Sequence, residues 1–260
     1  MGFKSPSFYF LSATLMFILT ASAGPIPSSI PSNPSYYSIS STAAECAAPT
    51  QTAQTQSQPS LAPNSHAISE SQLLQIAPSS GSCSGATFAD ECRTAAQAVP
   101  FINQAFETYR ITSAGERAAV LSIMAHESGE FKYNRNHYPV PGRPGQGTRN
   151  MQMPNYNLLY ARSIPALASQ VQQSSSGNDV ASFTPDRLNA VLELVMPDQY
   201  SFASGSWFLT SQCTDAVRQG LQKGDQNGFG DFINECVGTT PSADLYTYWE
   251  RAMEILETGD

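Results

Sequence analysis

A change in composition near residue 80 most constrains what this chain can fold into. Residues 24–80 are dominated by Ser, Pro, Thr, Gln and Ala and contain no Lys or Arg. Such a segment buries too little apolar surface to offset the entropy that is lost when it becomes ordered. We therefore predict a disordered, O-glycosylated stalk over residues 24–80. Residues 69–76 are the exception, because they have the pattern of a helical turn that can dock on the domain that follows.

Residues 81–260 contain both Trp residues and most aromatic residues of the mature chain, in about the length of one domain. Apolar residues recur there at helical spacing. We predict helices over residues 90–109, broken at Pro100, and over 113–127, 184–196, 201–209, 213–221 and 242–256. Residues 131–154 lack this spacing and are rich in Gly and Pro, so we expect a long functional loop with at most a small β ribbon. The predicted fold class is mainly α.

The N-terminus predicts the compartment. Lys4 precedes an apolar run over residues 8–19, and the small residues Ala21-Ser22-Ala23 follow it. This is the pattern of a secretory signal peptide, which we assign to residues 1–23. No later stretch approaches the ~20 apolar residues of a membrane helix. We predict a secreted, extracellular monomer with no membrane partner after cleavage.

Five cysteines in an exported chain favour disulfides over metal ligands, and no Cys-x-x-Cys spacing occurs. The pairing that we favour joins Cys83 to Cys92 and Cys213 to Cys236. Cys46 is then left free or pairs between chains, and the sequence does not settle the connectivity. We predict neither a metal nor a cofactor.

The net charge of -8 at pH 7 limits the partners. Nucleic-acid binding requires a basic face, so we expect no nucleic-acid partner. Enzymes that attack anionic bacterial walls are commonly cationic, and the acidity therefore favours a neutral or cationic polysaccharide or oligosaccharide.

Glu127 occupies a position at which the pKa of its carboxyl group is expected to change. Glu127 is expected at the end of an apolar helix, directly before Ser128 and Gly129. The carbonyls at a helix C-terminus and apolar neighbours both disfavour a carboxylate, so we expect a raised pKa. A carboxylic acid that stays protonated near pH ~5 to 6 can serve as a general acid.

These residues resemble the lysozyme-like superfamily. The sequence Glu127-Ser128-Gly129, followed by a Gly-rich loop and Met151-Gln152, resembles lytic transglycosylases and goose-type lysozymes. His126-Glu127 and residues 201–208 resemble plant-type chitinases, and residues 83–249 resemble uncharacterised secreted fungal proteins of this superfamily. The resemblance implies a secreted cell-wall glycosidase, either a hydrolase or a lytic transglycosylase, that cleaves β-1,4 links between N-acetylated amino sugars in peptidoglycan or a chitin-like polymer.

The resemblance also implies roles for individual residues. Glu127 would be the general acid, and Gln152 with the backbone around Met151 would hold a sugar. Side chains of the long loop and of the helix end are further sugar-binding candidates, namely Tyr133, Asn134, Tyr138 and His126. An inverting mechanism needs a second carboxylate at about 6.5–9.5 Å; the candidates are Glu130, Asp186 and Asp198. A transglycosylase needs none.

Departures from the family's pattern leave alternatives open. Asn150 stands where relatives have Leu, and the loop contains Arg135, Arg143 and Arg149, any of which could lower the pKa of Glu127 by pairing with it. The main alternative is a non-catalytic secreted carbohydrate-binding protein or effector on the same scaffold, so the sequence leaves open whether the protein is an enzyme. A zinc peptidase is disfavoured, because Glu130 replaces the second His of the metal motif.

Overall fold

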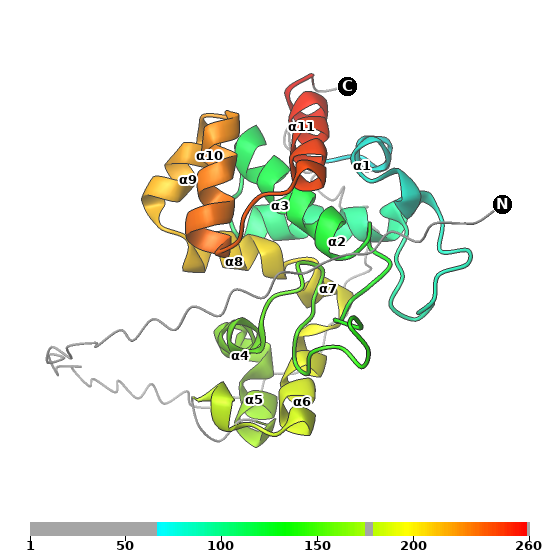
Figure 1. Cartoon of the computed structure of the whole chain (residues 1–260), viewed down its shortest axis with the longest axis vertical. Helices are drawn as coiled ribbons and strands as arrows, with labels where there is room; N and C mark the ends of the chain where they lie inside the picture. Colours follow the sequence, from blue (N-terminus) through cyan, green and yellow to red (C-terminus); the bar gives the residue numbers. More distant parts are fainter. Residues whose placement is uncertain (1–66, 175–178, 259–260) are drawn as a thin grey trace, which may run out of the picture. The chain divides into compact units, whose positions relative to one another are not determined.

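The computed structural model describes residues 67–174 and 179–258. This part of the chain is mainly α-helical and contains no β-sheet, as predicted (Figure 1). The predicted signal peptide, residues 24–66 of the predicted stalk and Cys46 lie outside the described residues. The α-helices are α1 (Glu70–Ile76), α2 (Ala95–Thr108), α3 (Ala114–Glu127), α4 (Pro154–Ser163), α5 (Ala168–Ser174), α6 (Pro185–Val195), α7 (Asp198–Ser201), α8 (Ser204–Gln212), α9 (Asp215–Gln222), α10 (Gln226–Asp231) and α11 (Ala243–Thr258).

Shorter helices connect these elements. Three are 3-10 helices: η1 (Pro78–Gly81), η2 (Pro165–Leu167) and η3 (Val180–Ser182). A π-helical segment, η4 (Phe232–Val237), follows α10 and ends at Gly238 in the left-handed conformation. Segments of this kind are rare and occur frequently at functional sites.

Helix α3 is the central element. It begins after Ser113, whose side chain accepts a hydrogen bond from the backbone of Glu116, as the capping pattern predicts. Every residue from Gly115 to Ala125 is buried, so α3 is surrounded by protein on all sides over this stretch. Gly115 permits this burial, because a Cβ atom there would lie 1.9 Å from the backbone oxygen of Leu221 in α9. Figure 1 shows α11 beside α3.

Two hydrophobic clusters form the core. The larger cluster surrounds α3 with side chains from α1, α2, α9 and α11. The smaller cluster joins α4, α5, α6 and α8. Helix α8 contributes side chains to both clusters, since Leu209 belongs to the larger cluster and Trp207 and Phe208 belong to the smaller one. Trp207 and Trp249 are core residues, with exposures of 4% and 6%.

Helical structure begins before residue 81, the predicted N-terminal boundary of the domain. Ile68, Leu73 and Ile76 are buried in the larger cluster, so the fold already includes the residues from 67 onward. The helical turn that the sequence suggested here is α1, which begins with a capping box at Ser69. A few apolar residues of α1 are enough to hold it on the domain, because α2 and α11 provide the surface against which they pack.

Pro100 does not break its helix. It lies inside α2, which continues from Ala95 to Thr108. Both Pro100 and Ala96, whose carbonyl loses its helical donor, are exposed, so water can satisfy that carbonyl. Helices α4, α5 and α10 were not predicted, because polar residues dominate their sequences.

The loop between α3 and α4 is ordered, as expected. Its predicted ribbon is reduced to two isolated bridges, in which Gly147 pairs with Arg135 and with Gln152. A side chain at Gly147 would lie 2.8 Å from both the backbone oxygen of Asn134 and a methyl group of Leu192. The loop can therefore fold against α6 only with glycine at this position.

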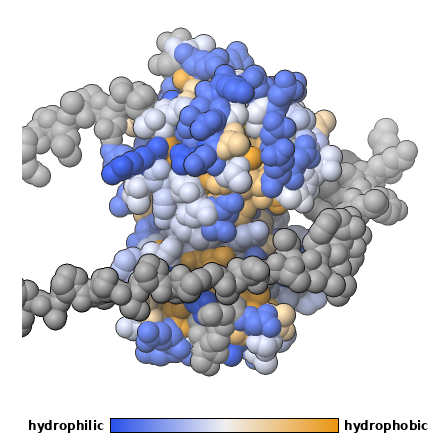
Figure 2. Space-filling model, turned by 90° about the vertical axis from the view of Figure 1, so that its left-hand side faces the viewer, coloured by the Kyte–Doolittle hydropathy of each residue, from blue (hydrophilic) through white to orange (hydrophobic). Residues whose placement is uncertain are grey.

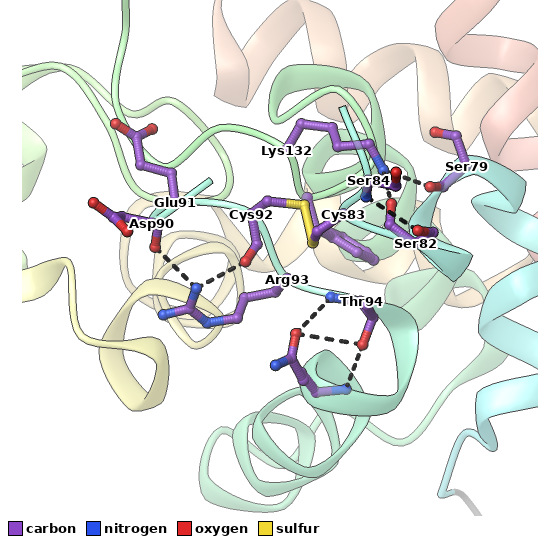
Figure 3. Close-up of a disulfide and its surroundings, with 12 residues drawn as sticks. Ser79, Ser82, Cys83, Ser84, Asp90, Glu91, Cys92, Arg93, Thr94 and Lys132 are labelled. Carbon is purple, nitrogen blue, oxygen red and sulfur yellow. Dashed lines mark hydrogen bonds between the residues drawn. A yellow bond between two sulfur atoms is a disulfide. The ribbon is translucent and has the colours of Figure 1, made fainter. Parts of the chain in front are cut away.

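The structure contains both favoured disulfides, Cys83–Cys92 and Cys213–Cys236. Figure 3 shows the first of them among polar side chains, with Lys132 pointing toward the carbonyl oxygens of Ser79 and Ser82. The second joins the end of α8 to η4. It therefore connects two elements that also line the site described next.

Candidate functional site

A cavity of about 390 Å³ lies between α3, α8, η4 and the loop before α4. Its walls combine apolar and polar side chains, and Glu127 and Arg143 are its ionisable lining groups apart from a tyrosine. Figure 2 shows hydrophobic residues of the described part reaching the surface in a hollow between more hydrophilic areas. The lining residues are Val120, Ile123, Glu127, Arg143, Gln146, Asn150, Met151, Gln152, Met153, Tyr156, Gly205, Phe208, Phe232, Val237, Gly238 and Thr239.

The end of α3 places Glu127 at this cavity. Ser128 is buried and its hydroxyl bonds back to the carbonyl of Met124 at 2.6 Å, while Gly129 adopts a φ of 58°. Glu130 and Phe131 continue in the left-handed region, at φ 56° and 69°. The chain therefore turns away sharply after Glu127 and leaves this side chain at the last helical position.

The carboxyl group of Glu127 has no ion-pair partner among the described residues. Burial raises its pKa from 4.5 to about 7. The side chain nevertheless reaches solvent, because it stands at the floor of an open cavity. Protein surrounds it on the other sides and limits its hydration, which disfavours the charged form. Up to roughly neutral pH the group is a proton donor.

A network of amides forms the polar wall opposite. The Gln152 amide donates to Asn157 Oδ1 at 2.7 Å, and Asn157 in turn donates to the carbonyl oxygens of Gly145 and Gln152. Asn150 receives hydrogen bonds from Thr148 at 2.8 Å and from Ser204 at 2.5 Å. Asn157 is buried and lines no part of the cavity, so it positions Gln152 from behind.

The backbone of this wall is strained. Thr148 has a φ of 65° and Met151 a φ of 45°, which residues other than glycine adopt rarely. The Gln146 amide donates to the carbonyl of Met151 at 2.9 Å and helps to hold this conformation. Such strain persists where surrounding contacts over-determine the backbone, and it clusters at functional sites.

A buried arginine holds the loop behind the wall. Arg149 is fully buried and donates to the carbonyl oxygens of Phe131, Tyr133 and Glu91 at 2.8–3.0 Å. Its guanidinium also lies 3.5 Å from Asp198. Burial lowers the pKa of Arg149 to about 10, with Asp198 acting in the opposite direction. The predicted possibility that Arg149 pairs with Glu127 is therefore wrong, because its two terminal nitrogens bond to Phe131, Tyr133, Glu91 and Asp198 instead.

Three of the predicted site residues meet in the cavity, namely Glu127, Met151 and Gln152. The other four binding candidates do not line it. Asn134 is buried and bonds to Met196 and Ser201, and Tyr133 packs on Gly129. Tyr138 is 55% exposed on the loop, and His126 lies edge-on to Tyr248. Burial lowers the pKa of His126, against the opposing effect of Asp244.

None of the three second-carboxylate candidates lines the cavity. Glu130 accepts hydrogen bonds from the backbone and hydroxyl of Ser79 and from the hydroxyl of Tyr248 at 2.8 Å. Asp198 pairs with Arg93 at 2.5 Å. Asp186 lies in the first turn of α6, as expected of a residue that favours the helix N-terminus. These carboxylates are structural.

The sequence did not reveal several lining residues. Neither Phe208 nor the segment from Phe232 to Thr239 was predicted to line a site. One signal was present, because Cys236 and the following Gly238 mark the end of a helical segment that a disulfide ties to α8. Arg143 was considered only as a possible partner of Glu127.

The fold and the site thus define a mainly helical domain with an open cavity beside an unpaired carboxyl group whose pKa is raised. Over 156 residues, 60% of its length, the chain is 51% identical to a bifunctional dioxygenase (DOX)-epoxy alcohol synthase (EAS) of Fusarium oxysporum (strain Fo5176). The matched part is 12% of that protein. No family model matches the chain, and no solved structure matches it.

This comparison corrects the predicted function. The relative is named for dioxygenase and epoxy alcohol synthase activities, so the lysozyme-like assignment, the cell-wall glycosidase acting on chitin or peptidoglycan, and the carbohydrate-binding alternative are wrong. The motif misled for a physical reason. Ser128 and Gly129 terminate helix α3, and Met151 and Gln152 belong to a strained turn, so both pairs have structural roles in this fold.

Other predictions are not tested by these findings. Secretion, the lack of a nucleic-acid partner and the monomeric state stay predictions. Within residues 67–174 and 179–258, no helix is long and apolar enough to span a membrane, and no group of three or more His, Cys, Asp or Glu side chains could hold a metal ion.

Proposed function

We propose that the domain binds an oxygenated, mainly apolar small molecule in the cavity and that Glu127 acts on it as a general acid. The observation that carries this proposal is the unpaired carboxyl group of Glu127, whose pKa is raised to about 7 at an open cavity. Ion-paired carboxylates elsewhere in the domain have structural partners. Glu127 has no such ion-pair partner, so its carboxyl group can donate a proton to a ligand.

The walls support a small ligand with a large apolar part. Val120 and Ile123 from α3, Phe208 from α8 and Phe232 from η4 contribute apolar surface. Binding sites for small molecules are typically concave and mostly apolar, with a few placed polar groups. Asn150 and Gln152 are such groups here, and their amides are held by hydrogen bonds.

The relative suggests the chemical class of the ligand. An epoxy alcohol contains an epoxide and a hydroxyl oxygen, both of which accept hydrogen bonds, on an otherwise apolar body. Because the chain matches 12% of that protein, we take only this chemical class from it and neither of its two named activities. An epoxide is also a group whose carbon–oxygen bond breaks readily once its oxygen is protonated.

The step that this site can perform is hydrolytic ring opening. Glu127 transfers its proton to the epoxide oxygen while one carbon–oxygen bond breaks, and a water molecule adds to the carbon. The added water returns a proton to the Glu127 carboxylate. The product is a vicinal diol, and no atom is oxidised or reduced overall. General-acid catalysis of this kind contributes about 10²–10⁴-fold in rate.

Turnover of an epoxyoctanol to the corresponding triol, followed by mass spectrometry in water labelled with heavy oxygen, tests the proposal. We expect one labelled oxygen in each triol and a rate that falls as the pH rises through about 7, because the acid must be protonated. Glu127→Gln should lower the rate at least about a hundredfold. Glu254→Gln, on the exposed side of α11, is the matched control and should keep the wild-type rate. Full activity in Glu127→Gln would contradict the proposal.

A further inference from the structure

Arg143 stands at the cavity without a carboxylate partner. Its guanidinium lines the cavity and lies 3.1 Å from the sulfur of Met153, a weak acceptor. No ion pair joins Arg143 to an acidic residue within the described ranges, whereas Arg93, Arg135, Arg149 and Arg218 all have such pairs. Most of its donors are therefore available to a ligand.

The backbone that carries Arg143 is held in place. The amide of Arg143 donates to Asn136 Oδ1 at 2.9 Å, and its carbonyl accepts from Gln146 at 3.2 Å. The preceding Gly142 has a φ of 87°, and a Cβ atom there would lie 2.1 Å from the backbone oxygen of Asn136. This close turn fixes where the arginine leaves the loop.

The charges around the cavity differ from those of the whole chain. The protein has a net charge of -8, yet Arg143 is the lining cation and Glu127 is uncharged until the pH approaches 7. The cavity is therefore locally positive by one charge in mildly acidic solution. A planar guanidinium matches a carboxylate, which it can bind through two parallel hydrogen bonds.

We propose that Arg143 binds the carboxylate of an amphiphilic ligand whose apolar body occupies the cavity. This inference rests on the proposed function, and it adds that the ligand is a monoanion with its charged end at Arg143. A single guanidinium compensates a single charge, so a phosphate monoester would retain excess negative charge in an acidic protein. A ligand without charge would leave the arginine with Met153 alone.

Binding of octanoate and octanol to the full chain, measured by calorimetry at pH about 6, tests this inference, because a free carboxylate is ionised there. We expect octanoate to bind about fivefold more tightly than octanol, the scale of one partly exposed ion pair. Arg143→Gln should remove this preference. Lys223→Gln, which removes an exposed cation at the end of α9, is the control and should keep it.

The outcomes separate the two proposals. Equal affinities for octanoate and octanol, or a preference that survives in Arg143→Gln, would overturn the role of Arg143 and leave the proposed function standing. Tighter binding of octyl phosphate than of octanoate would also overturn the assignment to a carboxylate. Failure of all three probes to bind would count against the small-molecule cavity itself.

Discussion

The charged side chains on the two sides of the loop between α3 and α4 differ in whether they have ion-pair partners. Behind the loop, Arg149, Asp198 and Arg93 form a connected group in which each charge has a partner. At the cavity, Glu127 and Arg143 have no ion-pair partner among the residues that the structure describes. The charged groups that stabilise the fold are paired with one another. The groups at the cavity lack such partners, so a ligand can supply them.

The same contrast occurs between two carboxyl groups three residues apart. Glu130 is tied to Ser79 and Tyr248 and joins the N-terminal segment to α11. Glu127 precedes the left-handed turn and projects into the cavity instead. Both residues are glutamates, and the sequence does not distinguish their roles. The turn after α3 decides which of the two carboxyl groups is structural.

The largest effect is expected from Arg149→Met. This change removes the donors of three backbone carbonyls and leaves Asp198 with one partner fewer. Breaking a buried charged network of this kind costs about 3–5 kcal/mol. Urea unfolding followed by circular dichroism measures the loss. A change below about 1 kcal/mol would remove the distinction between the two regions.

The disulfides offer the next comparison, because one lies near each region. Cys213–Cys236 closes a loop of 23 residues and Cys83–Cys92 one of 9. The chain-entropy relation gives about 3.4 kcal/mol for the longer loop and ~2.6 kcal/mol for the shorter one. Replacing each pair with serine and measuring unfolding checks the order. We expect ligand binding to suffer only in the Cys213→Ser, Cys236→Ser protein, since that bridge supports the cavity wall.

A smaller effect concerns pH and Glu127. Because the pKa is about 7 in the folded protein and ordinarily 4.5, the folded state holds a proton that the unfolded chain has lost between these values. Stability therefore falls as the pH rises from 4.5 to about 7, and the full penalty remains above that. Solvent contact limits it to about 1–2 kcal/mol. Glu127→Gln should flatten this part of the pH profile in thermal unfolding, and an unchanged profile would refute the raised pKa.

The smallest effect is expected from Arg143→Gln. An exposed arginine without an ion pair contributes little to folding, so the free energy of unfolding should change by less than about 0.5 kcal/mol. The same urea experiment as for Arg149→Met provides the comparison. A loss that approached that of Arg149→Met would mean that Arg143 is structural, and the contrast between the regions would be lost.

The sequence by itself determined the helical class, the ends of α3, α6 and α11 and the exceptional position of Glu127, whereas it favoured the two disulfides without settling their pairing. Each of these depends on local physics: capping residues, helical spacing, and glycine or proline at a boundary. The sequence also suggested α1, but not that its apolar residues belong to the core. Pro100 was misjudged because its exposure within α2 is a tertiary property.

Only the tertiary structure decided which polar residues are partners and which are free. Contacts with distant segments hold the side chains of Asn134, Glu130, Asp198 and Arg149. Glu127, Gln152 and Arg143 instead lie around one cavity. The tertiary structure also brought η4 to that cavity from more than a hundred residues away in the chain. Pairing depends on distances between elements, and local spacing cannot fix those distances because packing of the whole core sets them.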